Sequence, residues 1–267
     1  MKKKINKIMI LKNRVKGYMR KFTKIDKKIG NVNVKRIEEI FSNYKQDAVF
    51  VHAGLSDIKK AFNCNPYKFL MELLEKNFDS IYVPGFTPSF RKSGVYHKSF
   101  SKPEHSIFNR LFLSEANYRT NDCIHSILVK GNSCFNDCNH FDTFSLDGCF
   151  GKMDQENILY LNIGTNFLKS TQLHYIERLL KVPYMDVTEK KGIIYYNETD
   201  YEVVLQKNYK YNTKISWNRL KLEKDMKKEK MIDTYDLNGL KVRFFKAGDL
   251  MVFLENKINK DPYYLVK

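Results

Sequence analysis

The chain has 267 residues, of which 43% are hydrophobic and 14% aromatic, enough to build one large domain or two small ones with a buried core. Its five cysteines are irregularly spaced, which disfavours a disulfide framework and favours a reducing, cytoplasmic setting. No stretch approaches the roughly 18 apolar residues of a membrane span, and MKKKINKIMILKN lacks the apolar run of a signal peptide.

The formal net charge is +17, and residues 1–30 alone carry a net +11. Apolar residues recur in this segment at spacings of three and four, which predicts one basic amphipathic helix. Its stripe consists of Ile8, Leu11, Val15, Tyr18, Phe22, Ile25 and Ile29. The stripe can pack on the rest of the chain, or on a second subunit in a homodimer. It can also lie on the inner face of an anionic membrane as a peripheral contact. We do not expect nucleic-acid binding, because no DNA- or RNA-reading motif accompanies the helix.

From residue 31 the pattern alternates between helix and strand. Predicted helices are VKRIEEIFSNYK, PYKFLMELLEKN, SIFNRLFLSEAN and STQLHYIERLLK, and predicted strands are DAVFVHAG, SIYVPGF, HSILVKG and ILYLNIG. Such alternation is typical of an α/β fold with a mostly parallel central sheet covered by helices on both faces.

After Pro183 the pattern changes. IIYYN and YEVVLQKNY flank a turn-like ETD and predict an antiparallel hairpin, which is followed by the Lys-rich helix WNRLKLEKDMKKEK. The last 28 residues predict a strand, a helix and a tail. We find no internal repeat or flexible linker, so we expect a single domain over residues 31–267.

Several chemistries lack their motifs. The sequence has no GxxxxGK[ST] phosphate loop, no GxGxxG after a strand, no GxSxG nucleophile turn and no acetyl-CoA loop of the GNAT type. CFNDCNH brings together Cys134, Cys138 and His140, with Cys123, His125 and Cys149 nearby, a composition that zinc can use. Because CxxxC is irregular and unpaired, we expect ordinary core and loop cysteines and no metal.

The run ILYLNIGTNFLKSTQLHYIERLLKVPY carries the candidate reagents. A buried strand ends at Gly164, and in α/β sheets sites open where strands end in such loops. We expect Ser170 or Thr171 to cap the next helix. His174 falls in its first turn, and Glu177 lies three residues on, so both share a face. A base, a carboxylate that orients it and the Thr171 hydroxyl are the parts that acyl transfer needs, although a helical His followed by Glu also occurs for structural reasons.

With these motifs in hand, the sequence resembles the aminoglycoside 3-N-acetyltransferases, an antibiotic-acetyltransferase fold distinct from GNAT. DAVFVHAGLSDI resembles the family's VHSSLS turn, SIYVPGFTPSF its GTLVMPTFT strand, and RTNDCIHSILVKG its RSxHPxHSVAAxG segment. DTFSLDGCF resembles DSFGxxSxF. The most specific match is STQLHYIERLLKVPY, similar to TxLHyxExxxxVPYR. The resemblance implies an acetyl-CoA-dependent N-acetyltransferase of the type found in antibiotic resistance.

Residue by residue, the resemblance makes His174 the base that deprotonates the attacking amine, with Glu177 balancing its charge and Thr171 near the acetyl carbonyl. It places the turn His52, Ala53, Gly54, Leu55 and Ser56 along the coenzyme A arm, with His125 and Ser126 as neighbours. It places Thr87 and Ser89 toward the acceptor. For His52 and His125, packing at strand ends is the alternative interpretation.

Departures from the family bear on the substrates. Ala53 and Gly54 stand where the family has paired serines, and Asp122 and Cys123 replace its His-Pro. Ser145 and Met185 replace a Gly and an Arg. Because the chain is basic even beyond residue 30, and aminoglycosides are polycations, we expect an amino sugar on an anionic carrier, such as a nucleotide amino sugar of surface-polysaccharide synthesis. A catalytically inactive binding or scaffold protein of the same fold is the alternative.

Overall fold

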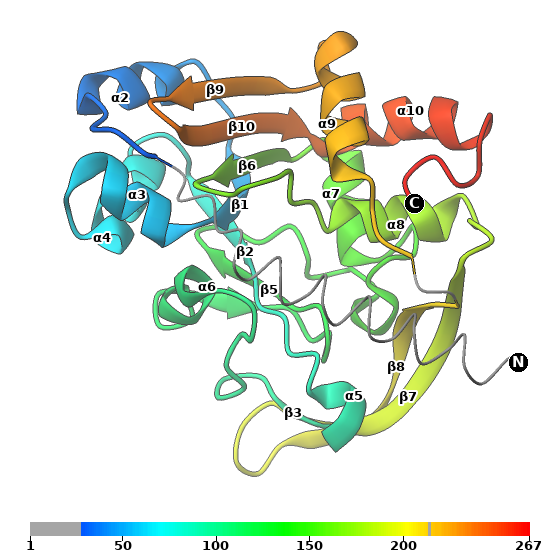
Figure 1. Cartoon of the computed structure of the whole chain (residues 1–267). Helices are drawn as coiled ribbons and strands as arrows, with labels where there is room; N and C mark the ends of the chain where they lie inside the picture. The colour runs from blue at the N-terminus through cyan, green and yellow to red at the C-terminus, as the bar shows by residue number, and fades with distance from the viewer. Residues whose placement is uncertain (1–27, 213–214) are drawn as a thin grey trace, which may run out of the picture.

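The computed structural model describes residues 28–212 and 215–267. A seven-stranded sheet forms the centre, with the strand order β4-β5-β2-β1-β6-β10-β9 (Figure 1). In chain order its strands are β1 (Ala48–Ala53), β2 (Ser80–Pro84), β4 (Tyr118–Arg119), β5 (Ile127–Lys130), β6 (Leu159–Ile163), β9 (Asp233–Leu237) and β10 (Leu240–Lys246).

The predicted α/β sheet is confirmed, with its parallel part confined to the three central strands. β1 pairs in parallel with β2 and β6, whereas β2–β5, β4–β5, β6–β10 and β9–β10 are antiparallel. Short connections explain part of this difference from a mostly parallel sheet. A parallel crossover needs a dozen or more residues, but β9 and β10 are joined by Asn238 and Gly239 alone, both with positive φ.

Helices cover both faces of this sheet, as predicted (Figure 1). On one face the apolar core includes residues of α2, α3, α4 and α6, and on the other it includes residues of α7, α8 and α10. The bounds are α2 (Val34–Ser42), α3 (Leu55–Phe62), α4 (Pro66–Glu75), α6 (Ile107–Phe112), α7 (Cys149–Gln155), α8 (Gln172–Leu179) and α10 (Ala247–Ile258). Pro66 occupies the first turn of α4 behind the capping side chain of Asn65, as its fixed φ allows.

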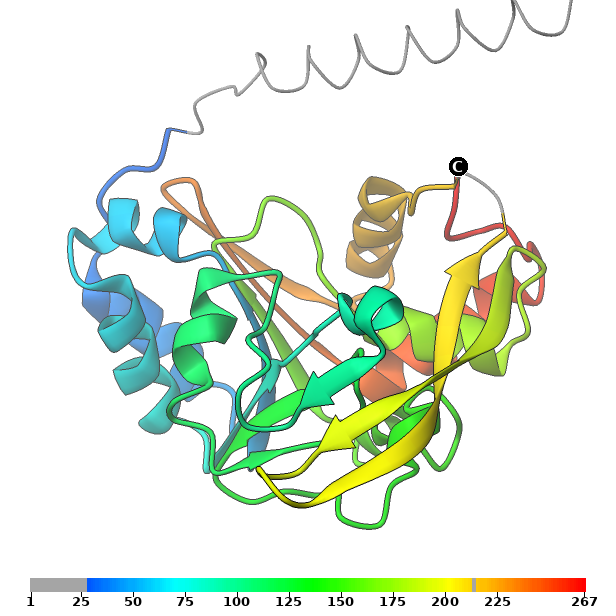
Figure 2. The same cartoon turned by 90° about the horizontal axis from the view of Figure 1, so that it is seen from below.

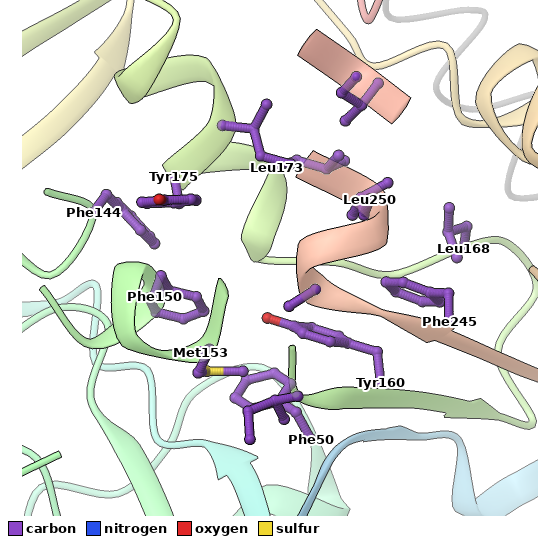
Figure 3. Packing of buried hydrophobic residues seen from close by; sticks show 14 of the residues in the cluster. Phe50, Phe144, Phe150, Met153, Tyr160, Leu168, Leu173, Tyr175, Phe245 and Leu250 are labelled. Atoms are coloured by element: carbon purple, nitrogen blue, oxygen red, sulfur yellow. The ribbon is translucent and has the colours of Figure 1, made fainter. Parts of the chain in front are cut away.

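The core beneath α8 is aromatic. Phe50 of β1, Tyr160 of β6 and Phe245 of β10 are buried on one face of the sheet and belong to the same cluster as Phe150 of α7 and Leu173 of α8 (Figure 3). Because side chains alternate along a strand, position 52 lies on the same face as Phe50, the face that α8 covers. The sheet therefore presents His52 on the side of the molecule that carries His174.

The C-terminal half adds a second, three-stranded sheet with the order β3-β7-β8. Its strands are β3 (Val95–His97), β7 (Met185–Tyr195) and β8 (Tyr201–Tyr211). β7 and β8 pair along their whole length, which confirms the predicted antiparallel hairpin (Figure 2). Three further helices complete the fold: α5 (Phe90–Ser93), the short 3-10 helix η1 (His140–Asp142) and α9 (Arg219–Lys228).

The predicted basic helix of residues 1–30 falls almost entirely outside the described residues, and so do its membrane and subunit contacts. Within residues 28–212 and 215–267, no helix combines the length and the apolar character needed to cross a bilayer.

Candidate active site

A cavity of about 580 Å³ opens beside the carboxyl ends of β1, β2 and β6. The ends of these strands, the loop between β6 and α8, and the beginnings of α6, α8 and α9 supply its wall. Ligand sites of α/β sheets lie at this edge, because the loops that leave parallel strands diverge there. The cavity is large enough for the reacting ends of two substrates.

His174 lines this cavity from the first turn of α8, as predicted. Its side chain is 26% exposed, and its ring packs beside Trp217 and Phe144 at centroid distances of 4.8 and 5.5 Å. The imidazole is therefore neither sealed in the core nor free in solvent. Aromatic neighbours restrict its rotation and leave one edge for a ligand.

Glu177 lies directly behind this ring, and its side chain is fully buried. Its Oε1 accepts hydrogen bonds from the Tyr184 hydroxyl at 3.1 Å and from the Trp217 indole N–H at 2.8 Å. Its Oε2 accepts one from the Tyr211 hydroxyl at 2.9 Å and lies 3.4 Å from His174 Nδ1. Three neutral donors thus satisfy a buried carboxylate that no Lys or Arg of the described residues neutralises.

This network determines the tautomer of His174. The Tyr211 hydroxyl has one proton, which it donates to Glu177, so at 3.3 Å it can only accept from His174 Nδ1. The neutral imidazole then carries its hydrogen on Nδ1, and the lone pair is on Nε2. A ring in this state can remove a proton from a ligand in the cavity.

Thr171 directly precedes α8, but the side chain of neither Thr171 nor Ser170 caps the helix. The Thr171 side chain makes no capping hydrogen bond, and its backbone is αR instead of the extended conformation usual at an N-cap. The predicted cap is therefore wrong. Both residues line the cavity, and the Ser170 hydroxyl is buried without a partner.

Gly54 and Gly164 bring the ends of β1 and β6 into close backbone contact. A Cβ on Gly54 would lie 2.2 Å from the Gly164 carbonyl oxygen, and Gly164 itself has a φ of +66°. The Gly54 N–H donates to the Ile163 carbonyl at 2.9 Å. Neither position has room for a side chain, which gives the Ser-to-Gly departure from the family motif a steric cause.

His52 also lines the cavity, in an environment opposite to that of His174. Its Nε2 is buried without a hydrogen-bond partner. Burial and the nearby charges of Lys169 and Arg219 lower its pKa to about 3. The ring is therefore neutral at physiological pH, and no carboxylate of the described residues pairs with it.

His125 forms a third part of the wall, 6.3 Å from the ring of His174. Its Nε2 lies 3.3 Å from Arg91 Nη2, and burial together with the Arg91 charge lowers its pKa well below the usual value. Asp122 stabilises the loop that carries His125, because its carboxylate accepts hydrogen bonds from the backbone N–H groups of Ile124 and His125 at 2.6 and 2.5 Å. Burial raises the pKa of Asp122 to about 7 despite these donors.

A sequence model of the aminoglycoside 3-N-acetyltransferase family matches residues 105–259, more than half of the chain. The chain belongs to this family. It is therefore an N-acetyltransferase, with acetyl-CoA as its co-substrate. The match includes His125, His174 and Glu177.

Solved structures of this fold agree with the assignment. The Bacillus subtilis YokD protein is 16% identical, with 88% of this chain and 96% of its own covered and a TM-score of 0.69. Aminoglycoside acetyltransferase AAC(3)-IIb is 12% identical, covering 87% and 98%, with a TM-score of 0.69. AAC-IIIb, solved with CoASH, is 11% identical, covering 80% and 90%, with a TM-score of 0.63. A search of curated protein sequences returns no match.

The residues that the family resemblance assigned divide into two groups. His52, Ala53, Gly54, His125, Thr171 and His174 all line the cavity. Leu55 and Ser56 begin α3, outside the lining, and Glu177 lies behind His174. Ser126 is fully buried, since its hydroxyl donates to the Gly85 carbonyl and accepts from Arg119 Nε, so direct contact with coenzyme A is not available to it.

The predicted acceptor residues also lie outside the cavity wall. The Thr87 side chain is buried, and its hydroxyl donates to the Cys123 carbonyl at 2.7 Å. Ser89 precedes α5, and its backbone N–H donates to Glu104. Arg91, two residues beyond Ser89, does line the cavity, although no sequence motif pointed to it.

The cysteine-rich segment forms a packed loop. His140 Nδ1 lies 3.4 Å from Cys149 Sγ, and Cys123 and Cys149 are fully buried. All five cysteines are free thiols. Among the residues that the structure describes, no three His, Cys, Asp or Glu side chains converge as metal ligands would.

Sequence reasoning missed the residues that reach the site from a distance. Tyr184, Tyr211 and Trp217 all bond to Glu177 from positions up to 40 residues away. Lys169 and Arg219 also line the cavity, from the loop before α8 and from the start of α9. Only Tyr184, within the VPY of the family motif, and Trp217, the single tryptophan, carried any signal.

Proposed function

We propose that this protein transfers the acetyl group of acetyl-CoA to an amine of an amino sugar, with His174 as the general base. The Tyr211–Glu177 network supports the proposal, because it holds the Nδ1 hydrogen of His174 and leaves Nε2 to take a proton from the attacking amine. Glu177 balances the imidazolium that results, over the 3.4 Å that separate it from Nδ1.

In this reaction the amine nitrogen bonds to the acetyl carbon and the carbon–sulfur bond breaks. His174 Nε2 accepts the amine proton and returns it to the departing thiolate, so no external acid or base is needed. Thr171 lines the cavity and caps no helix, so its hydroxyl can donate to the carbonyl oxygen as negative charge develops there. His52 and His125 are poor alternatives as the base, because burial, together with the cations next to both rings, lowers their pKa values.

The acceptor, we propose, is anionic, such as a nucleotide amino sugar of surface-polysaccharide synthesis. In the part of the chain that the structure describes, no Asp or Glu lines the cavity, whereas Arg91, Lys169 and Arg219 do. AAC(3)-IVa, a relative of 12% identity, was solved in complex with a gentamicin. A polycation of that kind would meet uncompensated positive charge in this cavity, while a diphosphate would be attracted.

We also place the enzyme in the cytoplasm. Its five cysteines are free, and the buried thiols of Cys123 and Cys149 have raised pKa values because burial disfavours their thiolates. Such thiols are stable in a reducing compartment. Oxidative refolding that produced a native disulfide would contradict this placement.

The central experiment is His174→Ala, assayed for release of free coenzyme A in the presence of a nucleotide amino sugar. We expect kcat to fall by about two to four orders of magnitude, with acetyl-CoA binding retained. A folded variant with full activity would overturn the role of His174. A wild-type protein that binds no acetyl-CoA in calorimetry would favour the scaffold alternative instead.

A further inference from the structure

Arg91 lines the cavity beside His125, and two side chains among the described residues hold its guanidinium. Its Nε donates to Asn208 Oδ1 of β8 at 2.7 Å, and its Nη2 lies 3.3 Å from His125 Nε2. A guanidinium has five N–H donors. The remaining donors have no acceptor among the described residues, and the side chain lines the cavity.

Arg91 has no carboxylate partner within residues 28–212 and 215–267. The two acids whose charges reach it are Asp122 and Glu104, and neither forms an ion pair with it or lines the cavity. Asp122 is committed to two backbone N–H groups, and Glu104 accepts from the backbone of Ser89. The buried Arg243 shows the usual solution, since its Nε donates to Glu223 at 3.0 Å. A half-buried guanidinium held in place without an ion-pair partner among the described residues is prepared for an anion from outside.

The cations of the cavity fall into two sets. The charges of Lys169 and Arg219 help to lower the pKa of His52, which burial lowers most. Lys169 Nζ and Arg219 Cζ lie 4.6 and 4.5 Å from the centre of the Phe167 ring. The charge of Arg91 acts on His125, together with those of His174 and His105. Arg91 borders the proposed base through His125, whose ring is 6.3 Å from that of His174. Arg219 borders it through Trp217: its Cζ is 5.1 Å from the centre of the Trp217 ring, which lies 4.8 Å from the ring of His174.

We propose that Arg91 binds the anionic group of the acceptor, a phosphoryl or carboxylate oxygen pair, and so determines which amines reach His174. The inference rests on the proposed function and adds the residue that selects its substrate. Asn208 orients the guanidinium from β8, which makes the long hairpin part of the acceptor site. The charges of Lys169 and Arg219 act on His52, a residue that the family resemblance places along the coenzyme A arm.

The test compares Arg91→Gln and Arg91→Lys with Lys92→Gln, which removes an exposed charge one residue further along α5. Steady-state rates are measured with a nucleoside-diphosphate amino sugar and with the methyl glycoside of the same amino sugar. For Arg91→Gln we expect KM for the diphosphate acceptor to rise about 10- to 100-fold. For the same variant, KM for the glycoside and for acetyl-CoA should stay within about twofold of the wild-type values. For Arg91→Lys, KM for the diphosphate acceptor should lie between those of the wild type and Arg91→Gln.

Calorimetry separates this proposal from the proposed function. The nucleotide amino sugar is titrated into each protein saturated with coenzyme A. Binding by the wild type that Arg91→Gln loses, without acetyl transfer, would support the anion site and overturn the reaction. No binding by the wild type would overturn the Arg91 assignment, and so would an unchanged KM in Arg91→Gln. A KM for acetyl-CoA that rises with the acceptor KM would assign Arg91 to the coenzyme phosphates instead.

Discussion

The α8 end and the β1 end of the cavity each present a histidine, and the surroundings of the two rings have opposite effects on protonation. At the α8 end, His174 has a buried carboxylate within 3.4 Å and a tyrosine hydroxyl that orients its Nδ1 hydrogen. At the β1 end, His52 has a buried, unpartnered Nε2 and the charges of Lys169 and Arg219 nearby. The comparison teaches that burial and the surrounding charges, and not the presence of an imidazole, decide which ring can act as a base.

The largest expected effect comes from removing the charge behind His174. Glu177→Gln keeps an acceptor for Trp217 and Tyr184, but its amide can present N–H groups to Nδ1 and reverse the tautomer. We expect kcat to fall by about 10²- to 10⁴-fold with the fold intact. The rate of acetyl transfer in a single turnover measures this fall.

Glu177→Ala serves as the structural counterpart of this variant. It leaves three buried donors without an acceptor, so the free energy of unfolding should fall by several kcal/mol, about 1–3 for each donor that water does not reach. If Glu177→Gln transferred acetyl groups at the wild-type rate, the carboxylate behind His174 would not be what makes this histidine, and not His52, the base.

We expect the pH dependence of stability to report that His52, at the β1 end of the cavity, is held neutral. The pKa of His52 is lowered to about 3 in the folded state, from about 6.5 in the unfolded chain. The neutral ring therefore contributes stability above pH 6.5, and this contribution is lost as the pH falls toward 3. It amounts to at most about 5 kcal/mol.

Urea unfolding of the wild type and His52→Asn at pH 7.5 and pH 4 measures this effect. At the lower pH the free energy of unfolding of the variant should rise relative to that of the wild type, because Asn has no proton to take up. A difference between the two proteins that is the same at both pH values would show that His52 is not held neutral.

Restoring the serine of the family motif at Gly54 tests the close contact of β1 and β6. In Gly54→Ser the new Cβ would meet the Gly164 carbonyl oxygen at 2.2 Å, so the strand ends must separate. We expect a loss of about 1–3 kcal/mol in the free energy of unfolding, together with weaker acetyl-CoA binding. Ala53→Ser adds a hydroxyl beside it at a position that already carries a Cβ. Thermal denaturation should rank Ala53→Ser well above Gly54→Ser, and the reverse order would count against the steric explanation.

The smallest expected effect comes from single hydroxyls around Glu177. Tyr211→Phe removes the group between His174 Nδ1 and Glu177, whose Oε2 remains 3.4 Å away and can accept directly. We expect a fall in kcat of less than about tenfold and a loss of about 1 kcal/mol in stability. Tyr184→Phe should cost similar stability without changing kcat, because its hydroxyl bonds to Glu177 and not to the histidine. Equal effects of the two variants on kcat would contradict the role assigned to Tyr211.

Local patterns predicted most of the elements that carry the site. The helix that holds His174, the strand that ends at Gly164 and the β7–β8 hairpin all lie where periodicity placed them, because each buries one continuous face. β9 was missed, although Asn238-Gly239 is a hairpin signal, since its alternation is weak and its residues are half exposed. The antiparallel outer strands were missed because pairing direction depends on connections and not on strand composition.

The sequence by itself determined the α/β class, the spacing that puts His174 and Glu177 on one helical face, and the surplus of positive charge, since all three follow from local order or composition. Only the tertiary structure decided which histidine has a carboxylate behind it. It also decided that Ser126 and Thr87 face inward and that Arg91 reaches the cavity. Side chains such as Tyr211 and Trp217 approach Glu177 from separate elements, and their distances depend on how the second sheet packs against α8, which no local pattern encodes.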